Sequence, residues 1–398
     1  MNVVLLSPVP VEGNPEIGSA YYTRALAQRL TSAGIDVEIW AKRTESPILR
    51  GADDPQPSIL KIWRPGFGAW LDIVRAIKTR RPRLLHIQHA MFVLGDGAAG
   101  ELSMLALLAT LIVMRQRVVI TCHDIPELRQ ITPEYIKLHK YRFPAGLVRF
   151  GLATLFWLIG VCASVVISHS EQFSEILAVD YKIPLSKLAV IKHLAIPYTT
   201  VPQSSARETL RLSHSKKYIL FFGFLTGYKG VELLLDAMTI LKDRSPSFHL
   251  LLGAGEHPKI KNTSDYQAYY ESIRSRAESL ENVTFVGFIP DEAIDLYIDA
   301  ADVAVFPYVE FQGMSGPLNQ CASHGKDALV SDAIAQKIPE LKACSFLCEP
   351  QEIADAITRY LSDPAFAEQT AAISAIYAKS VRSDEFLDLT VAAYAQAG

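Results

Sequence analysis

The stretch FFGFLTGYKGVELLLDA, Phe221–Ala237, combines a buried strand, a glycine turn with one lysine and an amphipathic helix. Tyr218–Phe222 is a short apolar run, as in a parallel strand covered on both faces. Gly223 allows the backbone to turn, and Lys229 directly precedes a helix predicted over Val231–Lys242. Unpaired N–H groups and the positive end of the helix dipole gather there, so the pattern predicts a phosphate-binding turn. A plain strand-turn-helix with a surface lysine fits the segment equally well.

Length and composition set the broad class of the protein. The chain has 398 residues, and one domain per roughly 150 residues gives an expectation of two or three domains. Its formal net charge of −3 argues against an overall preference for nucleic acid, which is not expected as a partner. The five cysteines are scattered without a C-x-x-C pair, which favours free thiols in a reducing, cytoplasmic compartment.

Three apolar or basic segments bear on membrane contact. No basic leader precedes the apolar run Val3–Leu6, which predicts a first strand and not a signal peptide. Met104–Met114 is apolar but too short for a span of about 20 residues, and Leu152–Ile167 predicts a helix followed by a strand. Basic and aromatic residues alternate from Lys137 to Phe150, which predicts a basic amphipathic surface helix. That helix would either attach to a membrane surface or present a solvated basic face.

Strand-like runs alternate with helical patterns, which predicts an α/β protein of two doubly wound parallel-sheet domains. The predicted domains are residues 1–198 and 216–378, joined by a polar linker at 199–215. Two such domains bind a ligand in the cleft between them, outside the carboxyl ends of the strands. The predicted strands are Val3–Leu6, Val37–Trp40, Leu84–Gln88, Val118–Thr121, Ser164–Ser168, Leu188–Lys192, Tyr218–Phe222, His249–Leu252, Val283–Val286, Val303–Phe306 and Ala328–Ser331.

The loops at the predicted carboxyl ends in the second half hold the candidate chemistry. Gly255 lies in a G-x-G turn, and Phe288 and Ile289 lie where the chain could border a flat base. Residues 313–317, Gly-Met-Ser-Gly-Pro, open a helix and predict a second anion-binding turn. Glu310 would be poorly placed beside two phosphate-binding turns unless it bound hydroxyls, so it indicates a sugar or a ribose.

The order and spacing of these segments resemble the family 4 (group 1) retaining glycosyltransferases of the GT-B fold. The segments are YYTRALAQRLTSAGIDVEIWA, HIQH, TCHD and SHSEQFSEIL, then FFGFLTGYKGVELLLDA, LLLGAGE and VTFVGFIPDEAIDLYIDAADVAVFPYVE. The resemblance covers almost the whole chain. It implies two Rossmann-like domains facing across a cleft, the first binding the acceptor and the second the nucleotide sugar. Ser383–Tyr394 resembles the family's terminal helix, so residues 379–398 are expected to cross back to the first domain.

The resemblance also implies the roles of single residues. Lys229 would hold the donor diphosphate, Glu310 would lie beside the donor sugar, and His123 would lie near the transferred sugar. The other expected donor-binding residues are Gly18, Gly223, Thr226, Gly255, Phe288, Ile289, Gly313, Met314, Ser315, Gly316, Asn319 and Gln320. Without the resemblance, His123 is better interpreted as a buried histidine bonded to the backbone. The same ambiguity applies to His86, His89, His169 and His193.

The implied reaction moves a hexose from a UDP- or GDP-linked sugar to a glycan or lipid-linked acceptor, in polysaccharide or glycolipid biosynthesis. The anomeric configuration would be retained, with the departing diphosphate oxygen helping to take the acceptor proton. Stabilisation of that leaving group would be the main contribution of the protein. Because Lys229 and helix N-termini can neutralise its charge, no metal or other cofactor is expected. The enzyme would work in the cytoplasm, with peripheral contact at the inner face of the membrane and the oligomeric state left open.

Two departures from the family's pattern leave alternatives open. Relatives often have an arginine before the lysine, but residues 224–228 contain no cation. Relatives also have a second glutamate, where this chain has Leu318, Asn319 and Gln320, and a neutral amide binds ribose hydroxyls less strongly. A catalytically inactive nucleotide-sugar-binding protein and a GT-B sugar-nucleotide epimerase are therefore the alternatives. A nicotinamide-dependent dehydrogenase would need a G-x-G-x-x-G after the first strand, which residues 7–18 lack.

Overall fold

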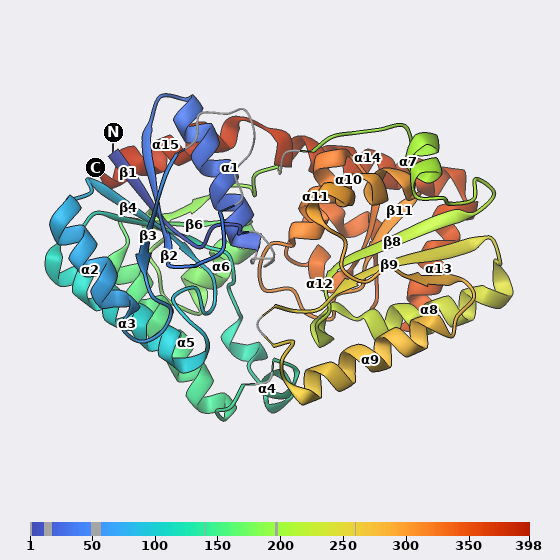
Figure 1. Ribbon diagram of the computed structural model, residues 1–398, viewed down its shortest axis with the longest axis horizontal. Coiled ribbons are helices and arrows are strands. Elements are labelled where there is room, and N and C mark those ends of the chain that lie inside the picture. The colour runs from blue at the N-terminus through green and yellow to red at the C-terminus, as the bar shows by residue number, and fades with distance from the viewer. Residues whose placement is uncertain (1, 12–17, 49–56, 140, 196–197, 259) are drawn as a thin grey trace. The chain divides into compact units, whose positions relative to one another are not determined.

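The computed structural model describes residues 2–11, 18–48, 57–139, 141–195, 198–258 and 260–398. The chain forms two compact units. The first consists of Met1–Leu194, Gln312–Met314 and Ser383–Gly398, and the second of Ala195–Phe311 and Ser315–Arg382. Each unit contains one parallel β-sheet whose strands alternate with helices along the chain, as Figure 1 shows. The predicted α/β class with two doubly wound parallel sheets is confirmed.

The sheet of the first unit has seven strands in the order β3-β2-β1-β4-β5-β6-β7. All neighbours are parallel, and the chain winds outward from β1 in both directions, which is the doubly wound pattern. The six strands predicted for this half are confirmed, and β3 was not predicted. The strands are β1 (Asn2–Leu6), β2 (Asp36–Lys42), β3 (Ser58–Trp63), β4 (Leu84–His89), β5 (Val118–Cys122), β6 (Val165–Ser168) and β7 (Leu188–Val190).

Helices cover both faces of this sheet (Figure 1). Tyr22 and Leu26 of α1 and Phe386 and Tyr394 of α15 share one apolar core with the strands, while α2, α3 and α5 pack side by side. The helices of the unit are α1 (Gly18–Ser32), α2 (Ala69–Arg80), α3 (Gly97–Met114), α4 (Pro133–Leu138), α5 (Ala145–Cys162), α6 (Glu171–Val179) and α15 (Glu385–Ala397), with the 3-10 turns η1 (Leu128–Gln130) and η2 (Leu185–Lys187).

Two helices of the first unit are long and apolar enough to cross a membrane, judged by length and composition alone. They are α3 and α5, each of 18 residues, so the apolar segment Met104–Met114 is part of a longer helix. The helix-then-strand prediction for Leu152–Ile167 is confirmed, because α5 connects the parallel neighbours β5 and β6. A βαβ connection of this kind places the helix on the face of the sheet.

The basic aromatic stretch from Lys137 to Phe150 is not one helix, so that prediction is wrong. Helix α4 ends at Leu138, and α5 begins after Pro144, whose backbone is extended. A residue before proline avoids the helical region of φ and ψ, and Pro144 therefore separates the two helices. Lys140 lies outside the described residues.

The sheet of the second unit has six parallel strands in the order β10-β9-β8-β11-β12-β13. The five strands predicted for this half are confirmed, and the short β13 was not predicted. The strands are β8 (Lys217–Phe224), β9 (Phe248–Gly255), β10 (Val283–Phe285), β11 (Val303–Phe306), β12 (Ala328–Ser331) and β13 (Ser345–Phe346). The helices are α7 (Gln203–Thr209), α8 (Val231–Arg244), α9 (Ser264–Glu278), α10 (Asp291–Ala300), α11 (Gly316–His324), α12 (Asp332–Ala335), α13 (Pro350–Ser362) and α14 (Pro364–Arg382), with the 3-10 turns η3 (Gly227–Lys229) and η4 (Pro339–Cys344).

The segment expected as a polar linker, residues 199–215, contains helix α7 and belongs to the second unit. Arg207 fixes it there, because its buried guanidinium donates from Nε to the Ala300 carbonyl (2.9 Å) and pairs with Asp302 (2.7 Å). The chain passes from the first unit to the second after Leu194 and, apart from Gln312–Met314, returns to the first only at Ser383. Residues 379–382 are therefore the end of α14, and α15 alone is the terminal helix of the first unit.

Candidate active site

The turn between β8 and α8 has the predicted strand-turn-helix structure. One 3-10 turn, η3, follows the strand, and Gly230 then adopts φ 64°, a left-handed conformation that favours glycine. A Cβ atom at Gly230 would also overlap the carbonyl oxygen of Pro307. This close approach of two backbones fixes the point where α8 begins. Lys229 is thereby held immediately before the positive end of the helix dipole.

Lys229 is buried, with 8% of its surface exposed, so the alternative of a plain surface lysine is wrong. A Cβ at Gly223 would lie 2.8 Å from its Nζ, and the ring centroid of Tyr308 lies 5.5 Å from it. Among the described residues, no carboxylate forms an ion pair with this ammonium. Burial lowers the pKa of Lys229 to about 8, so the group is mostly protonated at pH 7. A buried ammonium without a carboxylate partner is a strong site for an anion.

A flat aromatic surface lies at the carboxyl end of β9. Phe288 is 48% exposed, and its ring stacks on that of Phe224 with centroids 6.3 Å apart and planes 6° apart. A Cβ at Gly255 would lie 2.8 Å from Phe288 Cδ2, and one at Gly253 would lie 2.5 Å from Ile289 Cδ1. Gly253 and Gly255 lie within β9, so the predicted G-x-G turn after the strand is wrong, and the packing of Phe288 and Ile289 leaves no room for a Cβ at either position. This surface has the shape and polarity that a nucleobase needs for stacking.

Helix α11 begins at the second predicted turn. Ser315 caps it, because its Oγ accepts from the Leu318 N–H (3.3 Å) and lies 3.1 Å from the Tyr308 hydroxyl. Tyr308 therefore links this cap to Lys229. Tyr308, which follows β11 in the same loop as Glu310, is not among the site residues predicted from the sequence. Its position directly after a buried strand is the feature that could have indicated it.

The other predicted polar residues of the second unit differ in exposure. Asn319 is fully buried, and its Oδ1 accepts a hydrogen bond from the Tyr377 hydroxyl (3.0 Å), which makes it a core residue here. Gln320 and Glu310 are half-buried and keep surface for a ligand. The buried Oγ1 of Thr226 has no hydrogen-bond partner in the part of the chain that the structure describes, so it has a proton to donate to a ligand oxygen.

Gly18, Gly313 and Met314 belong to the first unit, whereas Ser315 and Gly316 belong to the second. Gly18 begins α1. Gly313 forms a β-bridge with Asp124, and a Cβ there would overlap the carbonyl oxygen of His123. The predicted donor-binding residues are therefore divided between the two units, and their common site stays a prediction.

His123 lies just past the carboxyl end of β5, and two further histidines occupy matching places after β6 and β7. His123, His169 and His193 are 8%, 2% and 6% exposed, and one ring nitrogen of each lies within 4.8 Å of the others. The ring of Tyr22 contacts all three, with centroid distances of 5.0, 5.4 and 4.8 Å. Burial lowers the pKa of His169 to about 4 and that of His193 to about 3, so these rings are neutral at pH 7.

The two ring nitrogens of His123 already have protein neighbours. Nε2 lies 2.9 Å from Gln88 Oε1, and Nδ1 lies 3.3 Å from Nε2 of His169. Contact of His123 with a sugar hydroxyl thus stays a prediction. His86 is a core residue, hydrogen-bonded to the Tyr394 hydroxyl at 2.7 Å.

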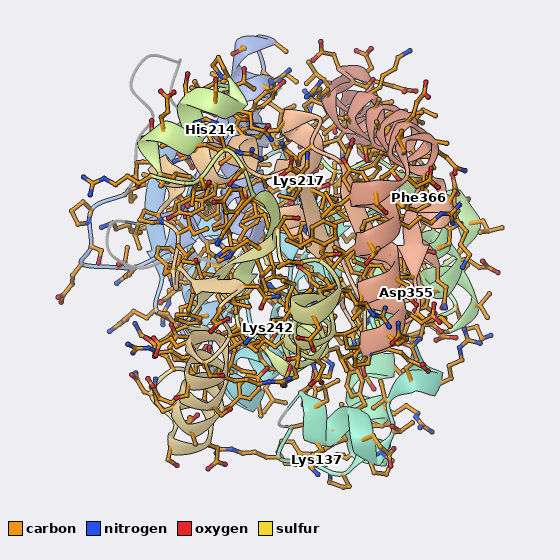
Figure 2. All side chains as sticks on the ribbon, turned by 90° about the vertical axis from the view of Figure 1, so that its right-hand side faces the viewer. Lys137, His214, Lys217, Lys242, Asp355 and Phe366 are labelled. Atoms are coloured by element: carbon orange, nitrogen blue, oxygen red, sulfur yellow. The ribbon has the colours of Figure 1, made fainter. Side chains whose placement is uncertain are left out.

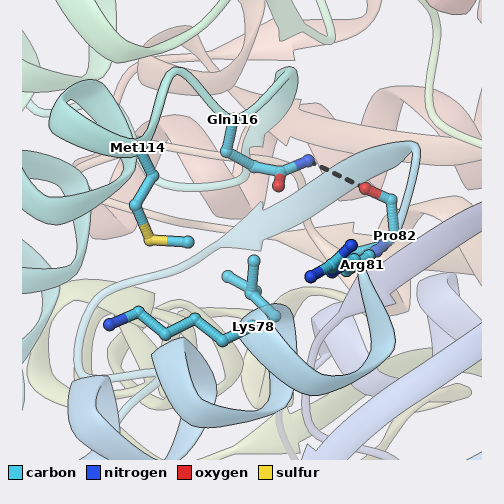
Figure 3. A pocket seen from close by; sticks show the side chains of 6 residues that line it. Lys78, Arg81, Pro82, Met114 and Gln116 are labelled. Atoms are coloured by element: carbon cyan, nitrogen blue, oxygen red, sulfur yellow. Dashed lines mark hydrogen bonds between the residues drawn. The ribbon is translucent and has the colours of Figure 1, made fainter.

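A pocket at the opposite edge of the first sheet is not part of this site (Figure 3). It lies where α2 and α3 end and where the chain enters β4 and β5, and Gln116 Nε2 donates there to the Pro82 carbonyl (3.1 Å). Doubly wound sheets bind ligands at the carboxyl ends of their strands, which are at the other edge. The lining residues are Ile77, Lys78, Arg81, Pro82, Met114 and Gln116.

Two family models match the chain. The model described as Glycosyltransferase Family 4 matches residues 18–193, and the model described as Glycosyl transferases group 1 matches residues 216–363. Together they cover more than three quarters of the sequence. The chain belongs to the family 4 (group 1) glycosyltransferases.

Curated relatives of this glycosyltransferase include an uncharacterised glycosyltransferase of Bacillus subtilis, 28% identical over 176 residues (39% of this chain and 46% of the relative). The mannosylfructose-phosphate synthase of Agrobacterium fabrum is 25% identical over 193 residues (43% of this chain and 42% of the relative). These matches span less than half the length of each relative.

Solved structures resemble the glycosyltransferase over its full length. Sucrose-phosphate synthase from Thermosynechococcus elongatus matches with a TM-score of 0.74 and 20% identity, covering 100% of this chain and 99% of that one. Anabaena HepE, solved in complex with UDP and glucose, matches with a TM-score of 0.69 and 17% identity, covering 99% of each chain. At these identities the likeness establishes the GT-B fold.

Proposed function

We propose that this glycosyltransferase moves a hexose from a nucleoside diphosphate sugar to a glycan or lipid-linked acceptor in polysaccharide or glycolipid biosynthesis. The observation that carries the proposal is the buried ammonium of Lys229 at the start of α8, which pairs with no carboxylate in the described part of the chain. A diphosphate would supply the negative charge that the described residues do not place there. The base stacks on Phe288, and Glu310 accepts from sugar or ribose hydroxyls. UDP is the first donor nucleotide to test, because HepE was solved with UDP.

In the proposed reaction the bond between the anomeric carbon and the diphosphate oxygen breaks, and the nucleoside diphosphate leaves with the electron pair. The acceptor hydroxyl attacks the same face of the sugar, so the configuration is retained, and its proton passes to the departing diphosphate oxygen. Lys229 and the N–H groups at the start of α8 stabilise the charge that develops on this leaving group. Because these groups are fixed before the reaction starts, little reorganisation is needed.

The test measures the melting temperature of the protein with UDP, GDP, ADP and the common sugar nucleotides of each. Analysis of the reaction products follows. A nucleoside diphosphate at 100 times its Kd should stabilise the protein by about 2.7 kcal/mol. Lys229→Ala should weaken diphosphate binding much more than nucleoside binding, and NMR of the product should show a retained anomeric configuration. If no nucleotide shifts the melting temperature at millimolar concentration, the proposal fails. Binding without transfer or donor hydrolysis indicates an inactive binding protein, and conversion of a donor without acceptor indicates an epimerase.

We also propose that α5 attaches the enzyme to the inner face of an anionic membrane. The helix has a second apolar face besides the one that packs inward: Leu147, Phe150, Trp157 and Val161 are between 45% and 69% exposed and recur at helical spacing. A helix on the outside of an α/β sheet normally presents polar residues to water. Exposed Arg142 precedes this face and would meet lipid phosphates.

Sedimentation with lipid vesicles tests this attachment. Wild type should bind vesicles of phosphatidylglycerol and phosphatidylcholine more strongly than phosphatidylcholine alone. Phe150→Glu and Trp157→Glu should each weaken binding about tenfold or more, because each buried apolar side chain contributes roughly 1.5–3 kcal/mol. Leu185→Glu is the matched control, since Leu185 is 74% exposed in the same unit but lies outside α5. Equal binding of all three variants and wild type would refute the attachment.

A further inference from the structure

Three histidines meet at the carboxyl edge of the first sheet. His123, His169 and His193 follow the neighbouring parallel strands β5, β6 and β7, and each offers one ring nitrogen to a common point. The tautomer of each ring decides whether those nitrogens carry protons. The contacts of the opposite ring nitrogens determine the tautomers.

Two of the tautomers follow from backbone contacts. Nδ1 of His169 lies 2.9 Å from the Ile191 carbonyl oxygen, and Nδ1 of His193 lies 3.0 Å from the Leu194 carbonyl oxygen. A carbonyl oxygen only accepts hydrogen bonds, so both Nδ1 atoms donate. Nε2 of each neutral ring is therefore unprotonated and carries a lone pair.

The orientation of the Gln88 amide sets the third tautomer. In the orientation found here, Nε2 of Gln88 lies 3.1 Å from Nε2 of His86, which also lies 2.8 Å from the Thr121 hydroxyl. The Oε1 of Gln88 then accepts from Nε2 of His123 (2.9 Å). His123 is left with a lone pair on Nδ1, which faces the lone pair on His169 Nε2 at 3.3 Å. Two lone pairs at this distance repel unless a cation or a proton lies between them, and a proton here would make the contact a hydrogen bond.

The distances fit a tetrahedral metal site. Zinc binds histidine nitrogen at about 2.0–2.1 Å, so neighbouring ligand nitrogens in a tetrahedral site are about 3.3 Å apart. His123 and His169 already have this spacing. The three ligand nitrogens all lie within 4.8 Å of one another, so a tetrahedral site would require the rings to move closer together. The outward N–H of each ring donates to an oxygen, which is the usual second-shell arrangement of histidine ligands.

We propose that His123, His169 and His193 bind one zinc-type divalent cation. Three histidines with a fourth position open to water or a substrate oxygen are typical of catalytic zinc sites. Lys229 lies in the other unit, so its role in diphosphate binding can be tested separately from the metal site.

Titration of the full-length, chelator-treated protein with Co²⁺ tests the site. We expect one equivalent to produce the intense visible absorption of tetrahedral Co²⁺, and Zn²⁺ to abolish it by displacement. His169→Gln and His193→Gln should each lose that spectrum. His214→Gln is the matched control, because His214 is an exposed histidine of the second unit (Figure 2) and should leave the spectrum unchanged. Gln88→Ala should weaken the affinity about 10- to 100-fold through the lost second-shell contact.

A reversed Gln88 amide is the arrangement that would overturn the proposal. In that orientation Gln88 donates to His123, and His123 Nδ1 donates directly to His169, which removes the lone pair needed for a metal. The wild-type protein would then show no tetrahedral Co²⁺ spectrum, or the His193→Gln variant would show the same spectrum as wild type. Urea unfolding of the metal-free variants shows whether a variant that loses the Co²⁺ spectrum is still folded. A folded His169→Gln or His193→Gln variant that still binds Co²⁺ tetrahedrally refutes the assignment.

Discussion

Replacing Lys229 with methionine should stabilise the ligand-free protein and abolish nucleoside diphosphate binding. Burial lowers the pKa of Lys229 from 10.5 to about 8, so the folded state disfavours the ammonium relative to the unfolded chain. At about 1.4 kcal/mol per pKa unit, the penalty is on the order of 3 kcal/mol below pH 8. It falls as the pH rises from 8 and disappears above 10.5, where lysine is neutral in both states. Methionine has a similar shape without the charge.

Urea unfolding of nucleotide-free protein at pH 7 and pH 10 measures this effect. Lys229→Met should be more stable than wild type by about 3 kcal/mol at pH 7 and by about 1 kcal/mol at pH 10. Lys242→Met is the control, because Lys242 lies on the same helix with 42% of its side chain exposed (Figure 2) and should change stability by less than about 0.5 kcal/mol. A Lys229→Met protein that is less stable than wild type at pH 7, or that still binds UDP with wild-type affinity, refutes the reasoning.

The affinity for UDP should fall about tenfold between pH 7 and pH 9, because Lys229 loses its proton from the free protein in this range; calorimetry that shows no change would mean that the ammonium does not contact the ligand. Gly230→Ala should destabilise the protein by about 2 kcal/mol or more in urea unfolding, since its Cβ overlaps the Pro307 carbonyl and its φ is 64°. Tyr394→Phe should lower stability by about 1–3 kcal/mol, because buried His86 loses a hydrogen-bond partner, and UDP binding should be unaffected.

The sheets were predictable because their strands are short apolar runs that end at glycine or polar turns. Strand β3 was missed because its sequence, SILKIW, has a lysine in the middle and lies at the edge of the sheet. The burial of Lys229 was not predictable, since the sequence places it in a turn but does not show that Tyr308 of a distant loop covers it. The core position of Asn319 depends in the same way on Tyr377, from a helix far along the chain.

The histidine cluster shows a second limit of prediction from one sequence. His123, His169 and His193 each follow a predicted strand, and each alone is as well explained by a structural hydrogen bond. Their convergence depends on the order β5-β6-β7, which brings three carboxyl ends together. Strand order is a property of the folded sheet, so a sequence without a stated topology cannot place the three rings together.

The two proposed sites belong to different units, which makes the two proposals separable by experiment. Lys229→Met should lose UDP and keep tetrahedral Co²⁺, whereas His193→Gln should lose Co²⁺ and keep UDP. Lys229 and His193 are separate residues, and substitutions at separate positions have additive effects when each variant is folded. If His193→Gln also lost UDP while its unfolding transition stayed at the wild-type position, the metal would act on donor binding, and the two units would be thermodynamically linked.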